Sequence, residues 1–472
     1  MNPDRIPVFA IIGHPNEGKS SVVSTLVEDD AVPISAVPGE TRYSRAYPIT
    51  VDDKELIRFV DTPGFQNPTE TLAWMQAFPG PPQDLLREFV EAHRWNPDFR
   101  DECEIFYPIM DRGGLIHVVD ASRPLRRTDR VEMEILRLTG LPRMAILNAK
   151  TGEEEFLSEW RAEFRRHFNM TKSFNPMRAT FAERLELLEG LRTIDEDWAP
   201  ALSGVVEAFR ADWAGRHRAA ARVAVSYLKA ALAMHRTGTC RDKSESEALR
   251  EKLFLTLKDA VAAREHQTFA QIRAIFRHRR LRPLLTAQSI LDKDIFAAQT
   301  WQVLGLTSGQ LAAVGALAGA GVGVLADALA HGLSLGAFAG LGGLLGAGAV
   351  LWQGDRLVKT RVAGLRLGGF RVTVGPVVNQ QFPFVLLDRF LIHYRHVVNW
   401  AHARREEPPL LAEGKQGPTS TWPSETRALV GRFFAAARKG SVQAGLQEAF
   451  QEALARELET VSMRELDERV LL

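Results

Sequence analysis

The sequence contains very little cysteine and almost no net charge. Only Cys103 and Cys240 occur, which excludes a disulfide framework, and no metal-ligand spacing surrounds them. Basic and acidic residues nearly cancel, 59 against 58, for a formal charge of +1. A dedicated nucleic-acid-binding domain usually carries a strong positive excess, so the composition argues against nucleic acid as the main partner.

A secretion signal and tandem repeats of domain-forming length are also missing. The chain begins MNPDRIPVFAIIG and passes directly into an apolar run, without a basic leader or a small-residue cleavage site. Together with the scarcity of cysteine, this predicts a cytoplasmic protein. At 472 residues the chain is expected to form several domains.

Residues 1–195 alternate short β-rich runs with amphipathic stretches. This alternation predicts an α/β domain with a mainly parallel sheet and helices on both faces. The expected strands are Pro7–Ile12, Arg45–Val51, Leu56–Asp61, Leu115–Asp120, Arg143–Asn148 and Thr171–Phe174. The expected helices are Ser20–Glu28, Arg130–Leu138 and Glu153–His167. The long connection 66–112 has helical spacing and predicts a helical insertion.

The clearest motif follows the first expected strand. Residues 13–20 read GHPNEGKS and match GxxxxGK[ST], between a strand and a helix. In such a loop the glycines let backbone N–H groups converge on phosphate oxygens, and the helix N-terminus adds positive potential. His14 could contact a nucleotide or serve as a spacer. The residues expected at the phosphates are Gly13, His14, Pro15, Asn16, Glu17, Gly18, Lys19, Ser20 and Ser21.

Two further motifs stand in the order that phosphate chemistry requires. Asp61-Thr62-Pro63-Gly64 ends an expected strand, and Thr41 lies in the loop before it. The predicted Mg²⁺ ligands are Ser20 and Thr41, with Asp61 supporting the ion through water. Lys19 is expected to stabilise phosphate charge, and the Gly64 N–H to sense the γ-phosphate. Lys19, Thr41 and Gly64 are therefore the predicted catalytic residues.

The runs GHPNEGKSS, PGETR and DTPGF together resemble the Era and TrmE branch of the P-loop GTPases. The whole chain further resembles a bacterial group in which such a GTPase precedes a C-terminal domain of unknown function, through EMEILRLTGLPRMAILN and VGPVVNQQFPFVLLDRF. The resemblance implies a Ras-like fold, GTP and GDP as ligands, Mg²⁺ as cofactor, and hydrolysis of GTP to GDP and phosphate. It implies no settled biological role.

The sequence departs from the family pattern at the base pocket. Guanine is normally read by N/T-K-x-D, but residues 148–151 read Asn-Ala-Lys-Thr, with the lysine shifted and no aspartate. Asn148 and Lys150 remain the candidate base contacts, and Glu153 could supply the acceptor. Guanine is preferred over adenine through the resemblance. Phe65 stands where Ras-like proteins place a water-orienting Gln, which predicts slow intrinsic hydrolysis.

The rest of the chain is expected to be mostly helical. A helical domain is predicted at 196–300, with a polar break at Thr237–Ser244, and a mostly helical C-terminal domain at 356–472. Between them, 301–355 has glycines four residues apart and predicts a glycine-zipper hairpin. Its second uncharged run, 332–352, has 21 residues, long enough to cross a bilayer. Tight packing without a membrane is the alternative.

Three hypotheses follow for the protein as a whole. In the first it is a GTP-hydrolysing switch at the cytoplasmic face of the inner membrane, engaging lipid, a protein partner or further copies of itself. In the second it is a soluble Era-like RNA or ribosome-assembly GTPase. Era carries a KH module with a GxxG loop, and the nearest match here, Gly340–Gly343, lies in an apolar run. In the third it is a nucleotide-binding scaffold with little hydrolysis.

Overall fold

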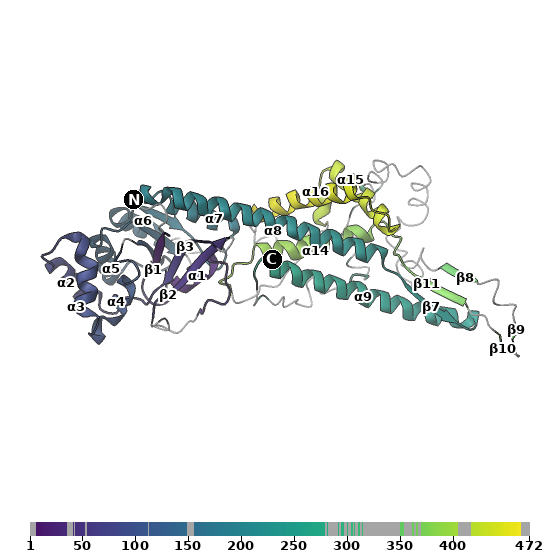
Figure 1. Ribbon diagram of the computed structural model, residues 1–472, viewed down its shortest axis with the longest axis horizontal. Helices are drawn as coiled ribbons and strands as arrows, with labels where there is room; N and C mark the ends of the chain where they lie inside the picture. The colour runs from purple at the N-terminus through teal and green to yellow at the C-terminus, as the bar shows by residue number, and fades with distance from the viewer. Residues whose placement is uncertain are drawn as a thin grey trace. The chain divides into compact units, whose positions relative to one another are not determined.

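The computed structural model (Figure 1) describes most of the chain outside one long central segment. The described residues are 6–34, 41, 43–51, 54–111, 113–148, 155–278, 281, scattered positions between 291 and 314, 350–353, 361–362, 365–366, 370–404 and 417–463. They form two compact units. Unit 1 comprises residues 1–215, 277–281 and 398–406, and unit 2 the remainder.

Unit 1 is built on a six-stranded sheet with the order β2-β3-β1-β4-β5-β6. Only the β2–β3 pair is antiparallel. The strands are β1 (Val8–Ile12), β2 (Arg45–Val51), β3 (Lys54–Asp61), β4 (Gly114–Asp120), β5 (Arg143–Asn148) and β6 (Met170–Ser173). The mainly parallel sheet expected from the sequence is confirmed. Because β1, β3, β4 and β5 are parallel, their carboxyl ends meet at one edge, where ligands bind in such folds.

Helices connect these strands, as parallel pairing requires. They are α1 (Lys19–Leu26), α2 (Pro68–Ala77), α3 (Leu85–His93), α4 (Arg100–Phe106), α5 (Arg127–Leu138), α6 (Leu157–His167) and α7 (Phe181–Leu191). One apolar core cluster joins β1, β4 and β5 to α2, α3, α4, α5 and α6. The inserted helices therefore pack with α5 and α6 against the same side of the sheet.

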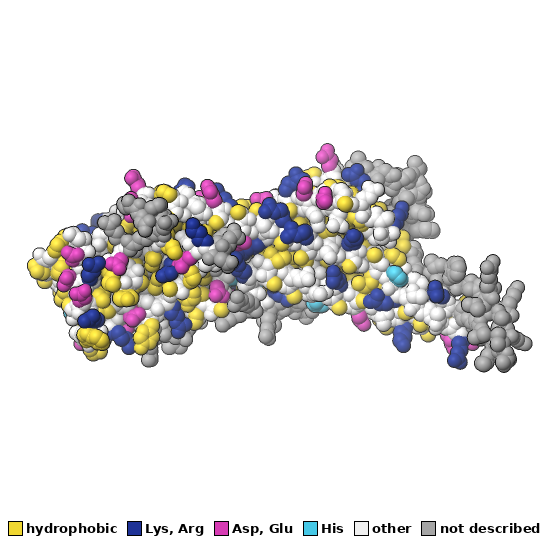
Figure 2. All heavy atoms as spheres, viewed as in Figure 1, with side chains coloured by type: hydrophobic (Ala, Val, Ile, Leu, Met, Phe, Trp, Pro, Cys, Tyr) yellow, Lys and Arg dark blue, Asp and Glu magenta, His cyan; other side chains and the backbone are white. Residues whose placement is uncertain are grey.

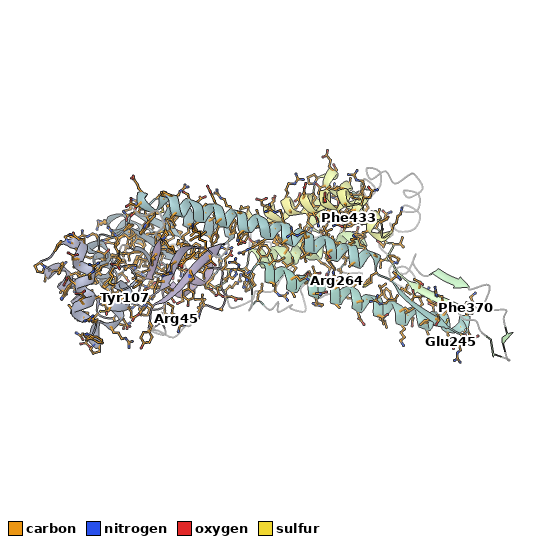
Figure 3. All side chains as sticks on the ribbon, in the orientation of Figure 1. Arg45, Tyr107, Glu245, Arg264, Phe370 and Phe433 are labelled. Atoms are coloured by element: carbon orange, nitrogen blue, oxygen red, sulfur yellow. The ribbon has the colours of Figure 1, made fainter. Side chains whose placement is uncertain are left out.

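The connection 66–112, for which the sequence predicts a helical insertion, contains the helices α2, α3 and α4. In α3 the apolar residues Leu85, Leu86, Phe89 and Val90 recur at helical spacing and are all buried. Phe89 meets Phe106 of α4 edge to face, with ring centroids 5.3 Å apart. The insertion is thus part of the unit 1 core. Tyr107, just after α4, is 65% exposed (Figure 3), whereas Ile109, two residues further on, is buried in the same core cluster.

Unit 2 is mainly helical, and the second half of the long helix α8 (Ala199–Ala233), from Arg216 on, belongs to it. Its other helices are α9 (Ser246–Ile275), α14 (Phe382–Val398), α15 (Ser424–Arg438) and α16 (Ala444–Met463). Phe433 of α15 packs on Phe450 of α16, with ring centroids 4.6 Å apart (Figure 3). The buried Arg389 donates to both oxygens of the buried Glu265 at 2.7 Å. This ion pair offsets the cost of burying two charges in the helical core.

A three-stranded sheet in unit 2 corrects two expectations. Its order is β7 (Arg236–Cys240), β11 (Phe370–Val374), β8 (Val350–Gln353), and both pairs are antiparallel. The polar break expected at Thr237–Ser244 therefore begins as a strand. The uncharged run 332–352 is likewise not helical to its end, because 350–352 pair with β11. In both places the strand pairs with β11, which is distant in the sequence. A pattern read from neighbouring residues carries no information about such a partner.

Residues 315–349, which hold most of the expected glycine-zipper hairpin, lie outside the described residues. Among the helices that the structure does describe, none has the length and hydropathy needed to cross a bilayer. On the face shown in Figure 2, acidic and basic side chains are interspersed. A short antiparallel pair, β9 (Arg361–Val362) and β10 (Leu365–Arg366), follows β8.

Candidate functional site

The loop between β1 and α1 has the backbone shape of a phosphate cradle. Gly13 and Gly18 have φ values of +150° and +99°, which favour glycine, and Asn16 has φ 67°. A Cβ on Gly13 would lie 2.2 Å from the Val118 carbonyl oxygen, and one on Gly18 would lie 2.6 Å from Asn148 Nδ2. Both glycines are therefore required by close approach of neighbouring atoms as well as by φ.

Lys19, the first residue of α1, lies under this loop. Its Nζ donates to the carbonyl oxygens of Gly13 at 2.9 Å and His14 at 3.1 Å. Burial lowers the pKa of Lys19, and the carboxylates of Asp61, Glu132 and Glu17 oppose that shift. The ammonium is thus held in place at little solvent exposure, where its interaction with an incoming anion is strong.

Ser20 and Asp61 meet beside the loop. Ser20 Oγ donates to Asp61 Oδ2 at 2.6 Å. Asp61 is buried, and its Oδ1 has no hydrogen-bond partner among the described residues. Burial also raises the pKa of Asp61, against the opposing effects of Ser20, Lys19 and Arg45. A buried carboxylate oxygen without a partner is costly, so a cation or ordered water is needed here.

This arrangement fits Mg²⁺ held jointly with a nucleotide. Hydroxyl and carboxylate oxygens are the ligands that Mg²⁺ prefers, and it usually takes only one or two of them from protein while phosphates supply others. Among the described residues, no group of three or more His, Cys, Asp or Glu side chains could hold a metal ion alone. Thr41, the other expected ligand, is half-buried, but 35–40 and 42 lie outside the described residues.

The segment after β3 packs directly on the phosphate loop. A Cβ on Gly64 would lie 2.6 Å from Pro15 Cδ and 2.8 Å from Pro15 N. Thr62 Oγ1 donates to the Ile11 carbonyl oxygen of β1 at 2.7 Å. Phe65 is buried and lies 6.1 Å from Phe106 between ring centroids. The side chain at the water-orienting position therefore points into the core.

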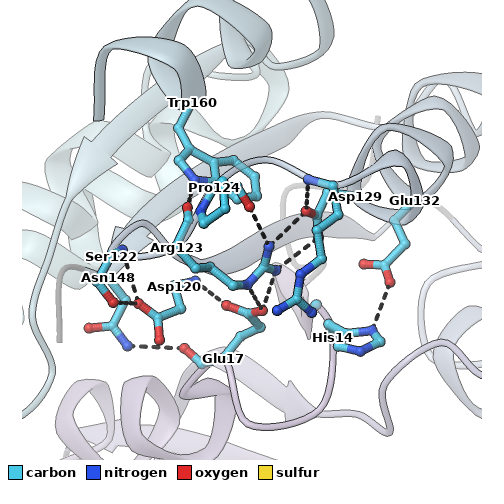
Figure 4. Close-up of polar contacts among 12 residues, drawn as sticks. His14, Glu17, Asp120, Ser122, Arg123, Pro124, Asp129, Glu132, Asn148 and Trp160 are labelled. Atoms are coloured by element: carbon cyan, nitrogen blue, oxygen red, sulfur yellow. Dashed lines mark hydrogen bonds and ion pairs between the residues drawn. The ribbon is translucent and has the colours of Figure 1, made fainter. Parts of the chain in front are cut away.

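Asn148, at the end of β5, is tied to the phosphate loop. Its Nδ2 donates to the Glu17 carbonyl oxygen at 3.0 Å (Figure 4), while its buried Oδ1 has no partner among the described residues. This places one of the two expected base contacts at the loop. Lys150 and Glu153 fall in 149–154, outside the described residues, so the rest of the base pocket remains a prediction.

An ion network that the sequence did not predict surrounds Glu17 (Figure 4). Arg123 Nε donates to Glu17 Oε1 at 3.0 Å, and Arg123 Nη1 and Nη2 donate to Asp129 at 2.8 Å. Although burial disfavours its charge, these two carboxylates raise the pKa of Arg123. The guanidinium also lies 5.2 Å from the centre of the Trp160 ring. The network fixes the phosphate loop to the loop after β4.

His14 contacts α5 in this structure. Its Nδ1 lies 3.3 Å from Oε1 of the buried Glu132. This hydrogen bond raises the pKa of His14, and burial raises that of Glu132. Arg123 stands in no recognisable motif, and Glu132 opens the run EMEILRLTGLPRMAILN, in which the resemblance assigned it no role. One feature of the sequence could have indicated Arg123 as a site residue: it comes just after a strand whose carboxyl end faces the site.

Two family models match the chain. Residues 161–460 match the model described as domain of unknown function (DUF3482), and residues 8–149 match the one described as 50S ribosome-binding GTPase. The proteins named GTPase Der from Yersinia pestis (strain Pestoides F) and Yersinia pseudotuberculosis serotype O:1b (strain IP 31758) are each 41% identical to this chain over 65 residues. That match covers 14% of this chain and 13% of the length of either relative.

Solved structures of GTP-binding proteins show a limited similarity. A point variant of Aquifex aeolicus Era bound to GDP.AlF4- has a TM-score of 0.30 at 14% identity, covering 57% of this chain and 89% of that chain. A point variant of S. thermophilus NFeoB bound to GMPPNP has a TM-score of 0.28 at 16% identity, covering 40% and 62%. The identification of unit 1 as a P-loop GTPase domain therefore rests on the family model and on the motifs.

Proposed function

This chain belongs to the family described as domain of unknown function (DUF3482), and from that premise we propose that its P-loop domain makes it a GTP-hydrolysing molecular switch. The observation that carries the proposal is the Ser20–Asp61 pair beside the buried Lys19, with Asp61 Oδ1 left unpaired. These groups converge where β1 and β3 end, which is the place for a phosphate-bound cation in this fold.

Phosphate binding is proposed for the backbone of residues 13–21. Its N–H groups and the N-terminus of α1 would surround the β-phosphate. Lys19 would move its ammonium from the carbonyls of Gly13 and His14 to the β- and γ-phosphate oxygens. Burial disfavours the charged form of Lys19, and contact with an anionic phosphate would stabilise the protonated ammonium.

Ser20, Thr41 and Asp61 are the residues that would hold Mg²⁺. The ion, when bound, supplies positive charge to the oxygens of the scissile phosphate. The Ser20 hydroxyl donates its hydrogen to Asp61 at 2.6 Å, so its oxygen lone pairs remain available to ligate the ion. Asp61 would keep that hydroxyl oriented while its free oxygen accepts from a coordinated water.

Hydrolysis requires a water to attack the γ-phosphorus as the bond to the β–γ bridging oxygen breaks, releasing GDP and phosphate. The Gly64 N–H is proposed to fix a γ-phosphate oxygen. Phe65, at the next position, is buried and offers no group to orient the water. We therefore propose a slow intrinsic rate, on the scale of unassisted Ras, about 10⁻⁴ per second, and a role for a partner or self-association in accelerating it.

The test is hydrolysis of GTP and of ATP by the full chain, with Lys19→Ala and the exposed Lys54→Ala as a matched control. We expect slow, Mg²⁺-dependent hydrolysis of GTP in preference to ATP, abolished in Lys19→Ala and unchanged in Lys54→Ala. Binding without any turnover would favour the scaffold hypothesis. A turnover above about one per second for the isolated protein would contradict the slow rate.

We also propose that the glycine-rich segment 301–355 brings this switch to a membrane at its cytoplasmic face. The support is its glycine spacing and the uncharged residues 332–349 that precede β8, with Arg356, Lys359 and Arg361 after that strand. The test is flotation with anionic liposomes without nucleotide, with a GTP analogue and with an ATP analogue. Flotation that changes with the GTP analogue alone is expected. If the protein never floats, the membrane proposal is wrong.

The second candidate is a ribosome-assembly GTPase. The observation favouring it is the match of residues 8–149 to the model described as 50S ribosome-binding GTPase. Co-sedimentation with ribosomal subunits, with and without a GTP analogue, distinguishes it from the membrane proposal. Nucleotide-dependent co-sedimentation without flotation would put this candidate first.

A further inference from the structure

The helix α4 (Arg100–Phe106) contacts both chain segments that adjoin the proposed γ-phosphate site. One segment, Gln66 and Asn67, follows Gly64. The other, Tyr43 and Ser44, follows Thr41. All of these residues lie in the part of the chain that the structure describes.

The contact to the segment after Gly64 is made by Glu102. Its Oε1 accepts from the backbone N–H of Gln66 at 2.8 Å and of Asn67 at 2.7 Å. Glu102 is fully buried. Charge-assisted hydrogen bonds to backbone N–H groups are stronger than neutral ones. They restrain the two peptides immediately beyond Gly64, in a segment where Asn67 Nδ2 also donates to the Asp98 carbonyl oxygen at 2.5 Å.

The contact to the segment after Thr41 is made by Glu104 and Arg100. The Ser44 N–H donates to Glu104 Oε2 at 2.9 Å, and Ser44 Oγ donates to the Glu104 carbonyl oxygen at 2.6 Å. The Arg100 guanidinium lies 5.6 Å from the centre of the Tyr43 ring. Ser44 is thus bonded to the helix through its backbone and its side chain, one residue before β2 begins.

We infer that Glu102 is a positioning residue for GTP hydrolysis, and that α4 couples the segments after Thr41 and Gly64. The inference rests on the proposed GTPase function. Glu102 acts through the backbone that carries the Gly64 N–H, which it fixes by accepting from the two peptides that follow. Through Glu104, two residues along the same helix, a shift of one segment is transmitted to the other.

The test compares Glu102→Ala, Glu102→Gln and the exposed Glu88→Gln of α3 in the full-length protein. Single-turnover GTP hydrolysis, GDP affinity and thermal unfolding are measured for each. We expect Glu102→Ala to slow hydrolysis roughly tenfold while GDP affinity changes less than about twofold. Glu102→Gln keeps an oxygen acceptor at the same place and should recover most of the rate. Glu88→Gln should match the wild type.

A second variant, Ser44→Ala, tests the other side of the helix without touching the core. It should weaken binding of a GTP analogue several-fold relative to GDP, because only the triphosphate is proposed to use the segment after Thr41. This variant keeps the inference testable if Glu102→Ala does not fold. Equal loss of GDP and GTP-analogue affinity in Ser44→Ala would overturn the coupling.

Other outcomes separate this inference from the proposed function. If the wild type neither binds nor hydrolyses GTP, the proposed function is wrong and the inference falls with it. If the wild type does both and Glu102→Ala hydrolyses at the wild-type rate, only the inference is wrong. A Glu102→Ala variant that lowers thermal stability and all nucleotide affinities together, without rescue by Gln, would show a purely structural role.

Discussion

Arg123 Nε donates to Glu17 Oε1 at 3.0 Å, which ties the phosphate loop to the loop after β4 through a largely buried ion pair. Removing one partner of such a pair leaves an uncompensated buried charge, which costs about 3–5 kcal/mol. We therefore expect Arg123→Met to lower the free energy of unfolding by about that amount and to weaken GDP binding. Chemical denaturation and nucleotide titration measure the two effects.

The double variant Glu17→Gln/Arg123→Met provides the control for this pair. Once both charges are gone, the unpaired carboxylate at Glu17 no longer contributes, so part of the lost stability should return. The exposed pair Arg210–Glu189 is the comparison, because Arg210→Met should change stability by less than about 1 kcal/mol. If Arg123→Met and Arg210→Met lower the free energy of unfolding equally, burial does not strengthen the contribution of the Arg123–Glu17 pair.

Asn148 should control nucleotide affinity through the loop rather than through overall stability. Its Nδ2 donates to the Glu17 carbonyl oxygen at 3.0 Å, and Asn148→Ala removes that contact. We expect GDP and GTP-analogue affinity to fall roughly tenfold, about 1.4 kcal/mol, with only a small change in thermal unfolding. Asn96→Ala is the matched control, because its side chain accepts from Asp98 N in an exposed turn of the insertion. Unchanged nucleotide affinity in Asn148→Ala would rule out this role.

Gly64 should tolerate no side chain. An added Cβ would meet Pro15 Cδ at 2.6 Å and Pro15 N at 2.8 Å, so Gly64→Ala must push the segment after β3 away from the phosphate loop. We expect GTP hydrolysis to fall by roughly 100-fold, as when one preorganised donor is lost, while GDP still binds. Gly215→Ala in α8 is the control, since nothing lies within 4 Å of its added Cβ. Hydrolysis by Gly64→Ala at the wild-type rate would contradict the role given to the Gly64 N–H.

The sequence predicted unit 1 better than unit 2 for a physical reason. Arg45–Val51 and Arg143–Asn148 were expected as strands with the bounds that β2 and β5 have. The apolar run of β5 is typical of a parallel strand, and β2, which pairs antiparallel with β3, lies between two motifs. In contrast, β7 was expected as a polar break. Its pairing partner β11 lies more than 100 residues away, and no local pattern encodes that pairing.

The candidate site likewise contains residues that local sequence patterns predict and residues that they do not. The phosphate loop, Asp61 and Gly64 could be predicted because the chemistry of phosphate binding demands those residues at short spacing. Glu102 could not, because its task is to accept from the backbone N–H of Gln66 and Asn67, a need that any buried acceptor could meet. Arg123, which pairs with both Glu17 and Asp129, differs from Glu102 only in its place just after a strand whose carboxyl end faces the site.

The buried His117 of β4 should make stability depend on pH. It stacks on Phe168, with ring centroids 5.5 Å apart, and burial lowers its pKa to about 4. Since an unfolded histidine titrates near 6.5, the unfolded state binds more protons between these values. Stability therefore falls as pH drops from about 6.5 toward 4, by up to about 1.4 kcal/mol per pH unit.

The variant that tests this is His117→Phe, which keeps an aromatic ring in the core and cannot be protonated. Its free energy of unfolding, measured by denaturant titration across this range, should lose that part of the acid dependence, whereas His235→Gln at an exposed position should keep it. The buried His217, whose pKa is also lowered to about 4, would still contribute a slope of its own. If His117→Phe shows the same acid dependence as the wild type, then His117 takes up its proton equally well in the folded and the unfolded protein. That result would contradict the lowered pKa expected from its burial.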